Sequence, residues 1–475
     1  MKNYDVEHAW HYHNGTKHPN GILLSRFHSF HPEMRPSPYK IYNDVQKIHL
    51  TLDKEPIGIS ALDAISNLDD SKVDDIPDLN VLTRLLYFSG GITRKIKFPP
   101  PVGEFEFRAA SCTGALYHIE IYVVCSDIPG LDAGVYHFDP KELKLHILRK
   151  GDFRQEIVDA TAEEDFVKQA PVMLIFTDVF SRNSIKYQAR EYRHAFWDCG
   201  TMLANTLAII SAHKISSRLI SGFVDHMINN LLGLDSNKEA SLFILPVGHT
   251  NKPIPKSSPL VSTNTESTNS DNDVDYPEIN YIHEASSLCN YIEVQSWRKH
   301  FIKSQQIVTD LIPLKNELLT TDGIEKVILK RGSTRTFSHD SISFEQLSTV
   351  RLPSGSYHYV KEKNSLQLLR GGDFRAISGN LGLGQDLPRD ASVTIFFMAN
   401  LQKILENFGN RGYRIAQLEA AIIGGKMYLA AYALGLGATG LTFYDDMVTN
   451  FFSPHATNKD PMFLIALGKK TTFHS

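Results

Sequence analysis

The stretch GVYHFDPKELKLHILRKGDFR, residues 134–154, returns in altered form as GSYHYVKEKNSLQLLRGGDFR, residues 355–375. The two stretches align without a gap at an offset of 221 residues. The alignment continues at the same offset, where residues 190–195 (REYRHA) meet residues 411–416 (RGYRIA), and an apolar helical stretch follows in both. A period of this length is too long for a solenoid repeat. The sequence therefore predicts a duplicated domain, and a fused pair of copies is expected to keep the self-facing, two-fold interface of a homodimer.

The composition excludes some classes of partner. The chain has 475 residues and a formal net charge of −4, which argues against a nucleic-acid or membrane partner held mainly by electrostatics. Its four cysteines include no CxxC pair, so we expect free thiols in a reducing, cytoplasmic setting. The N-terminal residues show no apolar segment of a secretory signal. The most apolar run, residues 420–441, contains Lys426, so we expect a core or interface helix there and no membrane span.

Composition also divides the chain into four segments. We expect an N-terminal helical extension over residues 1–80, a first domain over 81–249, a polar linker over 250–280 and a second domain over 281–475. The linker is rich in Ser, Thr, Asn, Asp and Pro. The extension is rich in histidine, at His8, His11, His13, His18, His28 and His31. No tetrahedral metal-binding spacing is complete among them, so we expect solvated or structural histidines and no metal site.

Several elements of the first copy can be predicted from local patterns. Residues 81–92 have apolar positions at helical spacing and stop at a pair of glycines. Residues 119–125 and 172–178 are predicted to be buried strands, and residues 188–210 a long helix. The small residues of RAASCTGALY, residues 108–117, precede the first of these strands. This segment is either a plain turn or a place where a flat ligand approaches the backbone closely.

The second copy carries a polar motif of its own, RGSTR, at residues 331–335. Two arginines that flank a serine offer fixed donors for a phosphate or for the carbonyl edge of a flavin, and a solvated helix end is the alternative. This copy has lost everything that corresponds to residues 93–133.

The stretch GLGATG, residues 435–440, matches the G-x-G-x-x-G template of dinucleotide-binding proteins. That fingerprint must follow a strand and open a helix. Here the motif ends a helical stretch, and the strand-like sequence LTFY follows it. We therefore expect these glycines to let backbone amides meet a flat ring.

Taken together, these motifs resemble the FMN-dependent nitroreductase superfamily and, within it, the tandem form of the SagB-type, ThcOx-like azoline dehydrogenases. The resemblance covers about residues 81–249 and 283–470. It implies an α+β fold with two tandem nitroreductase-like domains, each a central, mostly antiparallel sheet flanked by helices, which form an intrachain pseudo-dimer. In this superfamily the flavin lies at the subunit interface. Because RGSTR occurs only in the second copy and RAASCTGALY only in the first, we infer one FMN per chain at the interface of the two domains, and a second, decayed pseudo-site.

The resemblance also assigns roles to individual residues. Arg331, Ser333 and Arg335 would hold the phosphate and the pyrimidine edge of the flavin, with Lys469 reaching the phosphate. The ring would meet the backbone amides of Gly437 and Ala438, and the first domain would contribute Arg108, Cys112, Thr113 and Gly114. The family branch usually has Pro-Ser where this chain has Ser111-Cys112.

The family's catalytic Lys-Tyr pair matches Lys186-Tyr187, whereas the second copy has Asn407-Phe408 at that position. An exposed lysine beside a packed tyrosine is the structural alternative. We expect Tyr187, with a pKa depressed by the neighbouring Lys186, to remove a proton from the substrate.

These assignments favour a flavoprotein oxidoreductase that converts a peptide thiazoline or oxazoline to the azole, with hydride transfer to the flavin and O₂ as the electron acceptor. An NAD(P)H-dependent nitro- or quinone reductase on the same fold is one alternative. A catalytically dead scaffold subunit of a peptide-modifying complex is another. The expected partners are a peptide or small-molecule substrate and other peptide-modifying enzymes.

Overall fold

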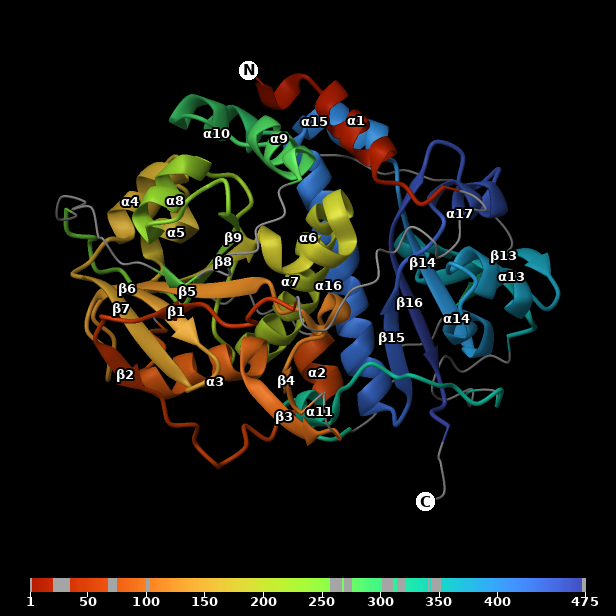
Figure 1. Cartoon of the computed structure of the whole chain (residues 1–475), viewed down its shortest axis with the longest axis horizontal. Coiled ribbons are helices and arrows are strands. Elements are labelled where there is room, and N and C mark those ends of the chain that lie inside the picture. The colour runs from red at the N-terminus through yellow and green to blue at the C-terminus, as the bar shows by residue number, and fades with distance from the viewer. Residues whose placement is uncertain are drawn as a thin grey trace.

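The computed structural model describes residues 2–19, 35–66, 75–99, 103–256, 267–268, 276–300, 311–313, 321–340, 342 and 352–471. Figure 1 shows two α+β lobes on either side of two long central helices, α7 (Glu191–Ala212) and α16 (Arg411–Ala433), which pack against each other. The predicted fold class is confirmed. Helix α16 contains most of the apolar run at 420–441, and in the described part of the chain no helix has both the length and the hydropathy to cross a membrane.

The two central helices approach each other at a pair of reciprocal positions. A Cβ atom on Gly200 would lie 2.5 Å from the Cβ of Ala421, and one on Gly425 would lie 2.6 Å from the Cβ of Ala204. Residues 200 and 421, like 204 and 425, are related by the offset of the repeat. Each copy therefore offers a glycine to the other copy's alanine, which is the reciprocity of a two-fold interface.

The first domain is built on a six-stranded antiparallel sheet in the order β2-β7-β6-β5-β8-β9. Its strands are β2 (Lys47–His49), β5 (Ile119–Cys125), β6 (Gly134–Asp139), β7 (Lys144–Lys150), β8 (Val172–Val179) and β9 (Glu239–Val247). Every residue of β5, β6, β8 and β9 is buried. The strands predicted at 119–125 and 172–178 are confirmed as β5 and β8.

The second domain has two separate three-stranded sheets, β11-β13-β12 and β14-β16-β15. Their strands are β11 (Leu311–Pro313), β12 (Gly355–Val360), β13 (Ser365–Gly371), β14 (Val393–Ala399), β15 (Gly437–Leu441) and β16 (Asp460–Gly468). The repeat maps β6 and β7 onto β12 and β13, β8 onto β14, and β9 onto β16. Among the described residues no strand takes the place of β5, because its counterpart belongs to the segment that the second copy has lost.

The first 80 residues are not purely helical, which corrects the predicted extension. They form α1 (Glu7–Gly15) and α2 (Ala61–Ser66), but also β1 (Ile41–Tyr42) and β2. Strand β2 pairs with β7 at Lys47 and His146, and β11 pairs with β13 at Leu311 and Gln367, which is the same position in the repeat. Helix α1 likewise packs on α9 (Pro277–Ala285). We propose that the repeated unit begins near α1 in the first copy and near α9 in the second.

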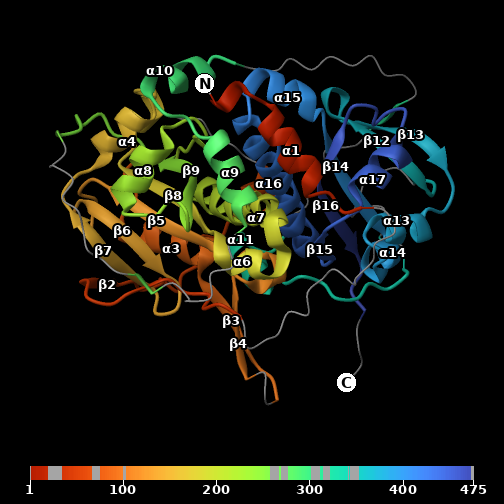
Figure 2. The ribbon, with the colours of Figure 1, turned by 45° about the horizontal axis from the view of Figure 1, so that its top comes forward.

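The remaining elements lie around these sheets. They are α3 (Leu79–Gly90), β3 (Ile92–Lys97), β4 (Glu104–Arg108), α4 (Arg154–Ala160), α5 (Asp165–Gln169), α6 (Phe180–Tyr187), α8 (Asp225–Leu232), β10 (Ser267–Thr268), α10 (Tyr291–Trp297), α11 (Ile324–Lys330), α13 (Arg375–Leu381), α14 (Asp386–Asp390), α15 (Leu401–Phe408) and α17 (Asp445–Phe452). The β3–β4 hairpin projects from the body of the molecule (Figure 2). The helix predicted over 81–92 is α3, whose amino end is capped by the carboxylate of Asp78, which accepts a hydrogen bond from the amide of Val81.

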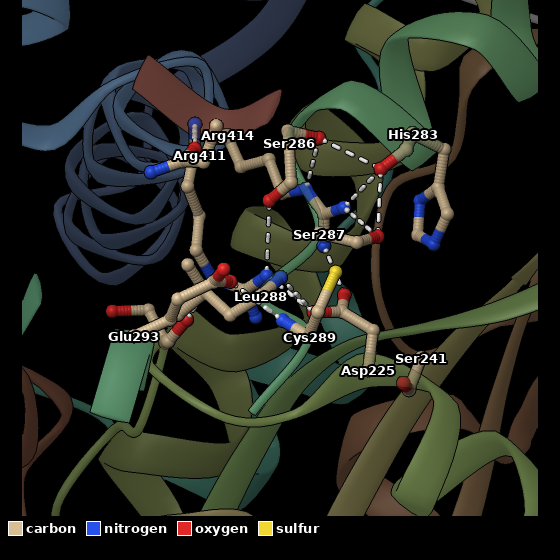
Figure 3. A network of polar contacts seen from close by, with 12 residues as sticks. Asp225, Ser241, His283, Ser286, Ser287, Leu288, Cys289, Glu293, Arg411 and Arg414 are labelled. Carbon is tan, nitrogen blue, oxygen red and sulfur yellow. Dashed lines mark hydrogen bonds and ion pairs between the residues drawn. The ribbon is translucent and has the colours of Figure 1, made fainter. Parts of the chain in front are cut away.

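The interface between the copies contains a buried charge cluster, shown in Figure 3. Arg411 and Arg414, in the first turn of α16, each donate a hydrogen bond to Asp225 of the first domain, at 2.6 and 2.8 Å. Arg414 Nε also donates to the Ser286 hydroxyl at 2.8 Å, and the Leu288 amide donates to Asp225 at 3.0 Å. Burial alone would raise the pKa of Asp225, but the two guanidinium groups lower it to about 2.

A second cluster repeats this arrangement with the two copies exchanged. Arg190 directly precedes α7, and Arg193 lies in its first turn. They donate hydrogen bonds to Asp445 of the second domain at 3.2 Å and 2.6 Å, respectively. Arg193 Nε donates to the Thr16 hydroxyl at 3.0 Å, and the His18 amide donates to Asp445 at 3.1 Å. Thr16 and His18 therefore play the parts of Ser286 and Leu288. The two domains are thus clamped together by equivalent contacts in both directions.

Candidate functional site

The RGSTR motif of the second copy reaches the small-residue segment of the first copy through Arg331. This side chain is buried, and its guanidinium donates to the carbonyl oxygens of Ala109 at 2.9 Å and Arg108 at 3.3 Å. Arg108 is itself buried, and its guanidinium donates to the carbonyl oxygens of Ile119 and Pro38. The two predicted half-sites therefore meet across the domain interface.

The rest of the RGSTR turn lies on β15. The Thr334 amide donates to the Ala438 carbonyl at 2.9 Å, and the Ser333 hydroxyl lies 3.5 Å from that of Tyr428. A Cβ atom on Gly437 would lie 2.4 Å from the Thr334 hydroxyl oxygen, so a glycine is required for this close approach. Arg335, in contrast, is exposed.

Strand β15 changes the expectation for GLGATG. The motif follows α16 and its last four residues already belong to the strand, so the strand begins earlier than the predicted LTFY segment. Gly437 and Ala438 are buried and paired with β16, and the Ala438 carbonyl is bonded to Thr334. Gly440 is more exposed than either. The helix before the motif agrees with the rejection of a dinucleotide-binding loop.

The basic side chain that contacts this turn is Lys470 rather than Lys469. The ammonium group of Lys470 lies 3.8 Å from the centre of the Tyr432 ring, and its Cγ atom is next to Gly437. Lys469 contacts Ser338 through its backbone carbonyl, which accepts a hydrogen bond from the Ser338 amide at 2.9 Å. Sequence reasoning missed Lys470 because the two adjacent lysines are indistinguishable until the end of β16 fixes which way each points.

The small-residue segment of the first copy is held by Asp198 of α7. The Thr113 amide and hydroxyl each donate to this carboxylate at 2.8 Å, and Cys112 Sγ lies 3.1 Å from it. Gly114 follows with φ of +63°, a conformation that favours glycine. The predicted residues Cys112 and Thr113 are thus anchored to the long helix rather than free.

Asp198 belongs to a buried network that the sequence did not reveal. His118 lies 2.8 Å from Asp198 through Nε2 and 2.7 Å from Asp178 through Nδ1, and Glu191 is 3.3 Å from the same Nδ1. Burial opposes a charge on His118, but the neighbouring carboxylates raise its pKa well above the usual value. Burial and Asp178 raise the pKa of Glu191. The ligand-type atoms of Cys112, His118 and Asp198 are close enough together for a metal ion, but hydrogen bonding of a charged His118 accounts for the same geometry.

The Lys186-Tyr187 pair ends α6 and lies against the small-residue segment. The Tyr187 hydroxyl would be 3.0 Å from a Cβ atom on Gly114, and the Tyr187 ring packs edge-on against His194 at 4.5 Å between ring centres. The Lys186 ammonium is 5.0 Å from the centre of the Tyr187 ring. The predicted catalytic pair and the predicted ring-binding loop therefore lie together.

The expected depression of the Tyr187 pKa is wrong. Burial, followed by the charge of Asp198, raises the pKa of Tyr187 well above its ordinary value. The pKa of Lys186 moves the other way, because burial and the nearby Arg35 and Arg335 lower it from 10.5. The tyrosine therefore keeps its proton at neutral pH, and the lysine is the member of the pair that is shifted toward a neutral base.

Cationic side chains from both domains gather around the RGSTR turn. They are Arg94, Arg331, Arg335 and Lys470, and among the described residues none of them forms an ion pair with an acid. The Arg94 guanidinium would lie 2.9 Å from a Cβ atom on Gly332, in the same turn. Such a group of like charges attracts a phosphate, which offers several acceptor oxygens. The residues present therefore fit the phosphate of FMN.

Trp297 lies beside the residue of the second copy that corresponds to Tyr187. This residue is buried, and its Nε1 atom donates to the carbonyl of Phe408, the counterpart of Tyr187, at 2.9 Å. A Cβ atom on Gly222, the counterpart of Thr442 just after β15, would lie 2.8 Å from the Trp297 ring. The indole ring therefore lies between the counterparts of Tyr187 and Thr442. The region of the first copy that corresponds to RGSTR, residues 64–70, is described only up to residue 66.

Comparison with protein families identifies this architecture. A sequence model of the Nitroreductase family matches residues 93–249 and 360–469, one segment in each copy. The chain belongs to the nitroreductase family. The two matched segments confirm that its nitroreductase-like domains are arranged in tandem, as predicted.

Curated relatives of this nitroreductase-family protein match over part of the chain. A putative nitroreductase of Methanocaldococcus jannaschii is 25% identical over 170 residues, which are 36% of this chain and 80% of that protein. The microcin B17-processing protein McbC of Escherichia coli is 23% identical over 143 residues, 29% of this chain and 53% of McbC. The trifolitoxin-processing protein TfxB of Rhizobium leguminosarum bv. trifolii is 26% identical over 172 residues, 34% of this chain and 45% of TfxB. The matches thus span about half the length of the two processing proteins.

One solved structure has the whole tandem arrangement. A putative nitroreductase from Anabaena variabilis superposes with a TM-score of 0.76 at 23% sequence identity, over 98% of this nitroreductase-family chain and 99% of the other. This likeness extends over the N-terminal residues as well as over both matched segments. At this identity it supports the fold alone.

Proposed function

We propose that this protein is an FMN-dependent oxidoreductase of the SagB type, which oxidises a thiazoline or oxazoline ring in a peptide to the azole. The observation that supports it most is the convergence of Lys186-Tyr187, the Gly114 loop and the RGSTR turn at one interdomain site. These groups come from both copies, and the second copy does not repeat the Lys-Tyr pair. This arrangement supports one composite site per chain.

The group of positive charges supports a position for the phosphate of FMN. Arg331 and Arg335, with Arg94 and Lys470, would hold the phosphate, and the Gly114 loop would face the ring from the first domain. Ser333, in the same turn, would donate its hydroxyl to this phosphate. When bound, the flavin accepts a hydride and passes the electron pair to O₂, which yields hydrogen peroxide.

The chain's own residues would handle the proton. Oxidation of an azoline removes two hydrogens, one as the hydride and one as a proton. Lys186, whose pKa is lowered by burial and by Arg35 and Arg335, is suited to accept that proton as a neutral amine. Tyr187, which keeps its own proton, is suited to donate a hydrogen bond to the substrate heteroatom. The proposed base is therefore Lys186, whereas the sequence predicted Tyr187.

Asp198 and His118 would keep the loop in position. Because Thr113 and Cys112 are bonded to Asp198, the loop conformation that brings Gly114 to Tyr187 depends on this carboxylate. The His118 ring orients Asp198 through its 2.8 Å contact. The geometry of the reacting groups is thus set by the long central helix of the interface.

The peptide substrate is supported by the relatives. McbC is named as a microcin B17-processing protein and TfxB as a trifolitoxin-processing protein. The putative nitroreductase of Methanocaldococcus jannaschii supports the second candidate, an NAD(P)H-dependent reductase. The two candidates predict different reductants for the flavin. Rapid bleaching of bound flavin by NADH or NADPH would favour the reductase.

The test uses the purified protein loaded with FMN and a synthetic thiazoline-containing peptide. The proposal predicts that the peptide loses two hydrogens by mass spectrometry, that hydrogen peroxide forms in equal amount, and that the reaction needs O₂. A flavin that is reduced only by NAD(P)H, with the peptide unchanged, would support the reductase instead. A protein that binds no flavin after reconstitution would support the scaffold alternative.

A further inference from the structure

The second domain lacks the strand that holds the first domain's sheet together. In the first copy β5 pairs with β6 on one side and with β8 on the other, over all seven residues of β5 on the β8 side. In the second copy the counterparts of those neighbours, β12 and β14, are edge strands of two different sheets. Among the described residues, the loss of the segment corresponding to 93–133 therefore leaves β12 and β14 each with one uncovered edge.

The hairpin β12–β13 keeps its place although the strand beside it is gone. Arg149 donates to the Leu231 carbonyl in the first copy, and its counterpart Arg370 donates to the Phe451 carbonyl in the second. The hairpin also keeps its internal geometry, because Tyr136 and its counterpart Tyr357 each follow a bulge and donate to the carbonyl four residues earlier.

The start of β14 is tied to the same hairpin unit. Arg154 donates to the Ala170 carbonyl at 3.1 Å, and its counterpart Arg375 donates to the Ala391 carbonyl at 3.0 Å. Both flanks of the missing strand are therefore fixed as in the first copy. Since neighbouring strands lie about 4.8 Å apart, the two edges are expected to stand about 10 Å apart, the width of one intervening strand.

The strands that border this gap are unusually exposed for their position in the fold. All seven residues of β14 are partly exposed, whereas all eight residues of its counterpart β8 are buried. On the hairpin side, Tyr359 of β12 is 51% exposed and Leu368 of β13 is 44% exposed. The sequence of β14, VTIFFMA, carries no charge. β14 pairs with β16 on one side, and an apolar, uncharged edge such as its other side, which no described strand covers, is a template for pairing with another chain.

We propose that the gap between β12 and β14 is a docking site for an extended peptide segment, which takes the place of β5 by strand addition. Main-chain hydrogen bonds to the two edges supply affinity, and the apolar side chains of β14 and the hairpin favour β-branched and aromatic residues in the peptide. The first copy shows the preferred occupant, since β5 reads IEIYVVC.

The geometry favours a single peptide strand over a second copy of the protein. A gap closed on both sides by strands of one molecule accepts one strand, whereas the sheet edge of another copy needs one open side. The site also lies close to the candidate active site, because β14 is separated from β15, which carries Gly437, by β16 alone. A peptide in the gap would lie three strand spacings from β15, which correspond to about 14 Å. A peptide that extends beyond the gap can cover this distance to the flavin site.

The test is hydrogen exchange of the full-length protein with and without a probe peptide. The probe carries the seven residues of β5 with serine in place of the cysteine and two lysines at each end for solubility. The proposal predicts that β14 and β12 amides exchange at least tenfold faster than those of β8 and β6 in the free protein, and that saturating probe slows them by a similar factor. The same probe with N-methyl groups at alternate residues is expected to protect less.

Matched variants test the location. Ile395→Lys in β14 is expected to weaken binding of the fluorescent probe about tenfold, while Ile292→Lys, at a 74% exposed position on α10, leaves it within twofold. Free-protein β14 amides as slow as those of β8 would overturn the proposal, because the chain itself would then fill the gap. A concentration-dependent dimer whose formation protects β14, with no effect of the probe, would overturn it in favour of a second copy. Neither readout depends on flavin or turnover, so failure here is separable from failure of the proposed chemistry.

Discussion

The contacts that clamp the two copies together exist twice, whereas the residues of the candidate site exist once. Asp225 accepts hydrogen bonds from Arg411 and Arg414, and Asp445 accepts them from Arg190 and Arg193, at 2.6 to 3.2 Å. At the candidate site, in contrast, Lys186-Tyr187 corresponds to Asn407-Phe408 in the other copy, where Trp297 packs against Phe408. Each clamp holds both domains, so both have been kept. Under the proposed function one site is sufficient for the chemistry, which explains why the second copy has not kept the Lys-Tyr pair.

The largest effect, a loss of stability, is expected when one of the two buried arginine–aspartate clusters is broken. Asp225→Ala leaves two buried guanidinium groups without their carboxylate, and so does Asp445→Ala. Removing one partner of a buried ion pair costs about 3–5 kcal/mol, so each variant is expected to lose most of its stability against urea or heat. Asp165→Ala, at an exposed position of the first domain, is the control and is expected to change little.

The comparison would be weakened if only one of the two clamp variants were destabilised. Acid provides a second readout. The pKa of Asp225 is about 2 in the folded protein, below its ordinary 3.8, so its stabilising contribution is present above pH 4 and is lost as the pH falls toward 2. The pKa of Asp445 is also lowered, by Arg190 and Arg193, and its contribution disappears in the same direction.

A loss of turnover is expected when Lys186, which the second copy replaces with Asn407, is changed. Lys186→Ala removes the proposed base, and a positioned base contributes about 10²–10⁴-fold to a rate. Asn407→Ala changes the corresponding position of the second copy and is expected to leave the rate unaltered. Both are measured as azole formation by FMN-loaded protein. Equal losses in the two variants would contradict the single site.

The pH profile sharpens the assignment of the base. The proposed reaction requires neutral Lys186, so the rate rises with pH through the pKa of Lys186, which lies below the ordinary 10.5. Lys186→Arg keeps a fixed charge because a guanidinium does not lose its proton in this range, and it is expected to be inactive at every pH. Tyr187→Phe should lower the rate without moving the midpoint. A midpoint that disappears in Tyr187→Phe would return the role of base to the tyrosine.

A smaller effect is expected on flavin affinity. Arg335→Gln removes one charge from the group around the RGSTR turn, and we expect FMN to bind about tenfold more weakly, since hydrogen bonds to charged groups contribute about 1.5–3 kcal/mol. Lys214→Gln, at an exposed position of the first domain, is the control. Riboflavin, which lacks the phosphate, should bind both variants and the wild type alike. A loss of riboflavin affinity in Arg335→Gln would place this arginine at the ring instead.

Local patterns were sufficient for elements with strong periodicity or β-branched content. The strands at 119–125 and 172–178 were predicted from their β-branched and aromatic residues, and both are fully buried. The helix near 81–92 was predicted from apolar residues at helical spacing. Strand β15 begins earlier than predicted because its first residues are glycine, alanine and threonine, whose strand conformation is imposed by pairing with β16.

The repeat at the N-terminus escaped sequence comparison for a different reason. Thr16 and Ser286 share a hydroxyl, and His18 and Leu288 act through their backbone amides, so little identity is needed to conserve the contacts. The intervening loss of a segment also changes the offset between the copies. The raised pKa of Tyr187 could not be foreseen either, because Asp198 and the surrounding burial come from elsewhere in the fold, and Lys186 is the only charge visible beside it in sequence.

The central claim is that duplication left one working site, and the stoichiometry of bound flavin tests it most directly. Purified protein would be saturated with FMN, freed of excess, and its flavin absorbance compared with the chain concentration, for the wild type and for Trp297→Ala. The account predicts one FMN per chain in both, because removing Trp297 opens space but restores neither the Lys-Tyr pair nor the small-residue segment. Two FMN per chain in the wild type would contradict it, since the filled pseudo-site would then bind flavin as well.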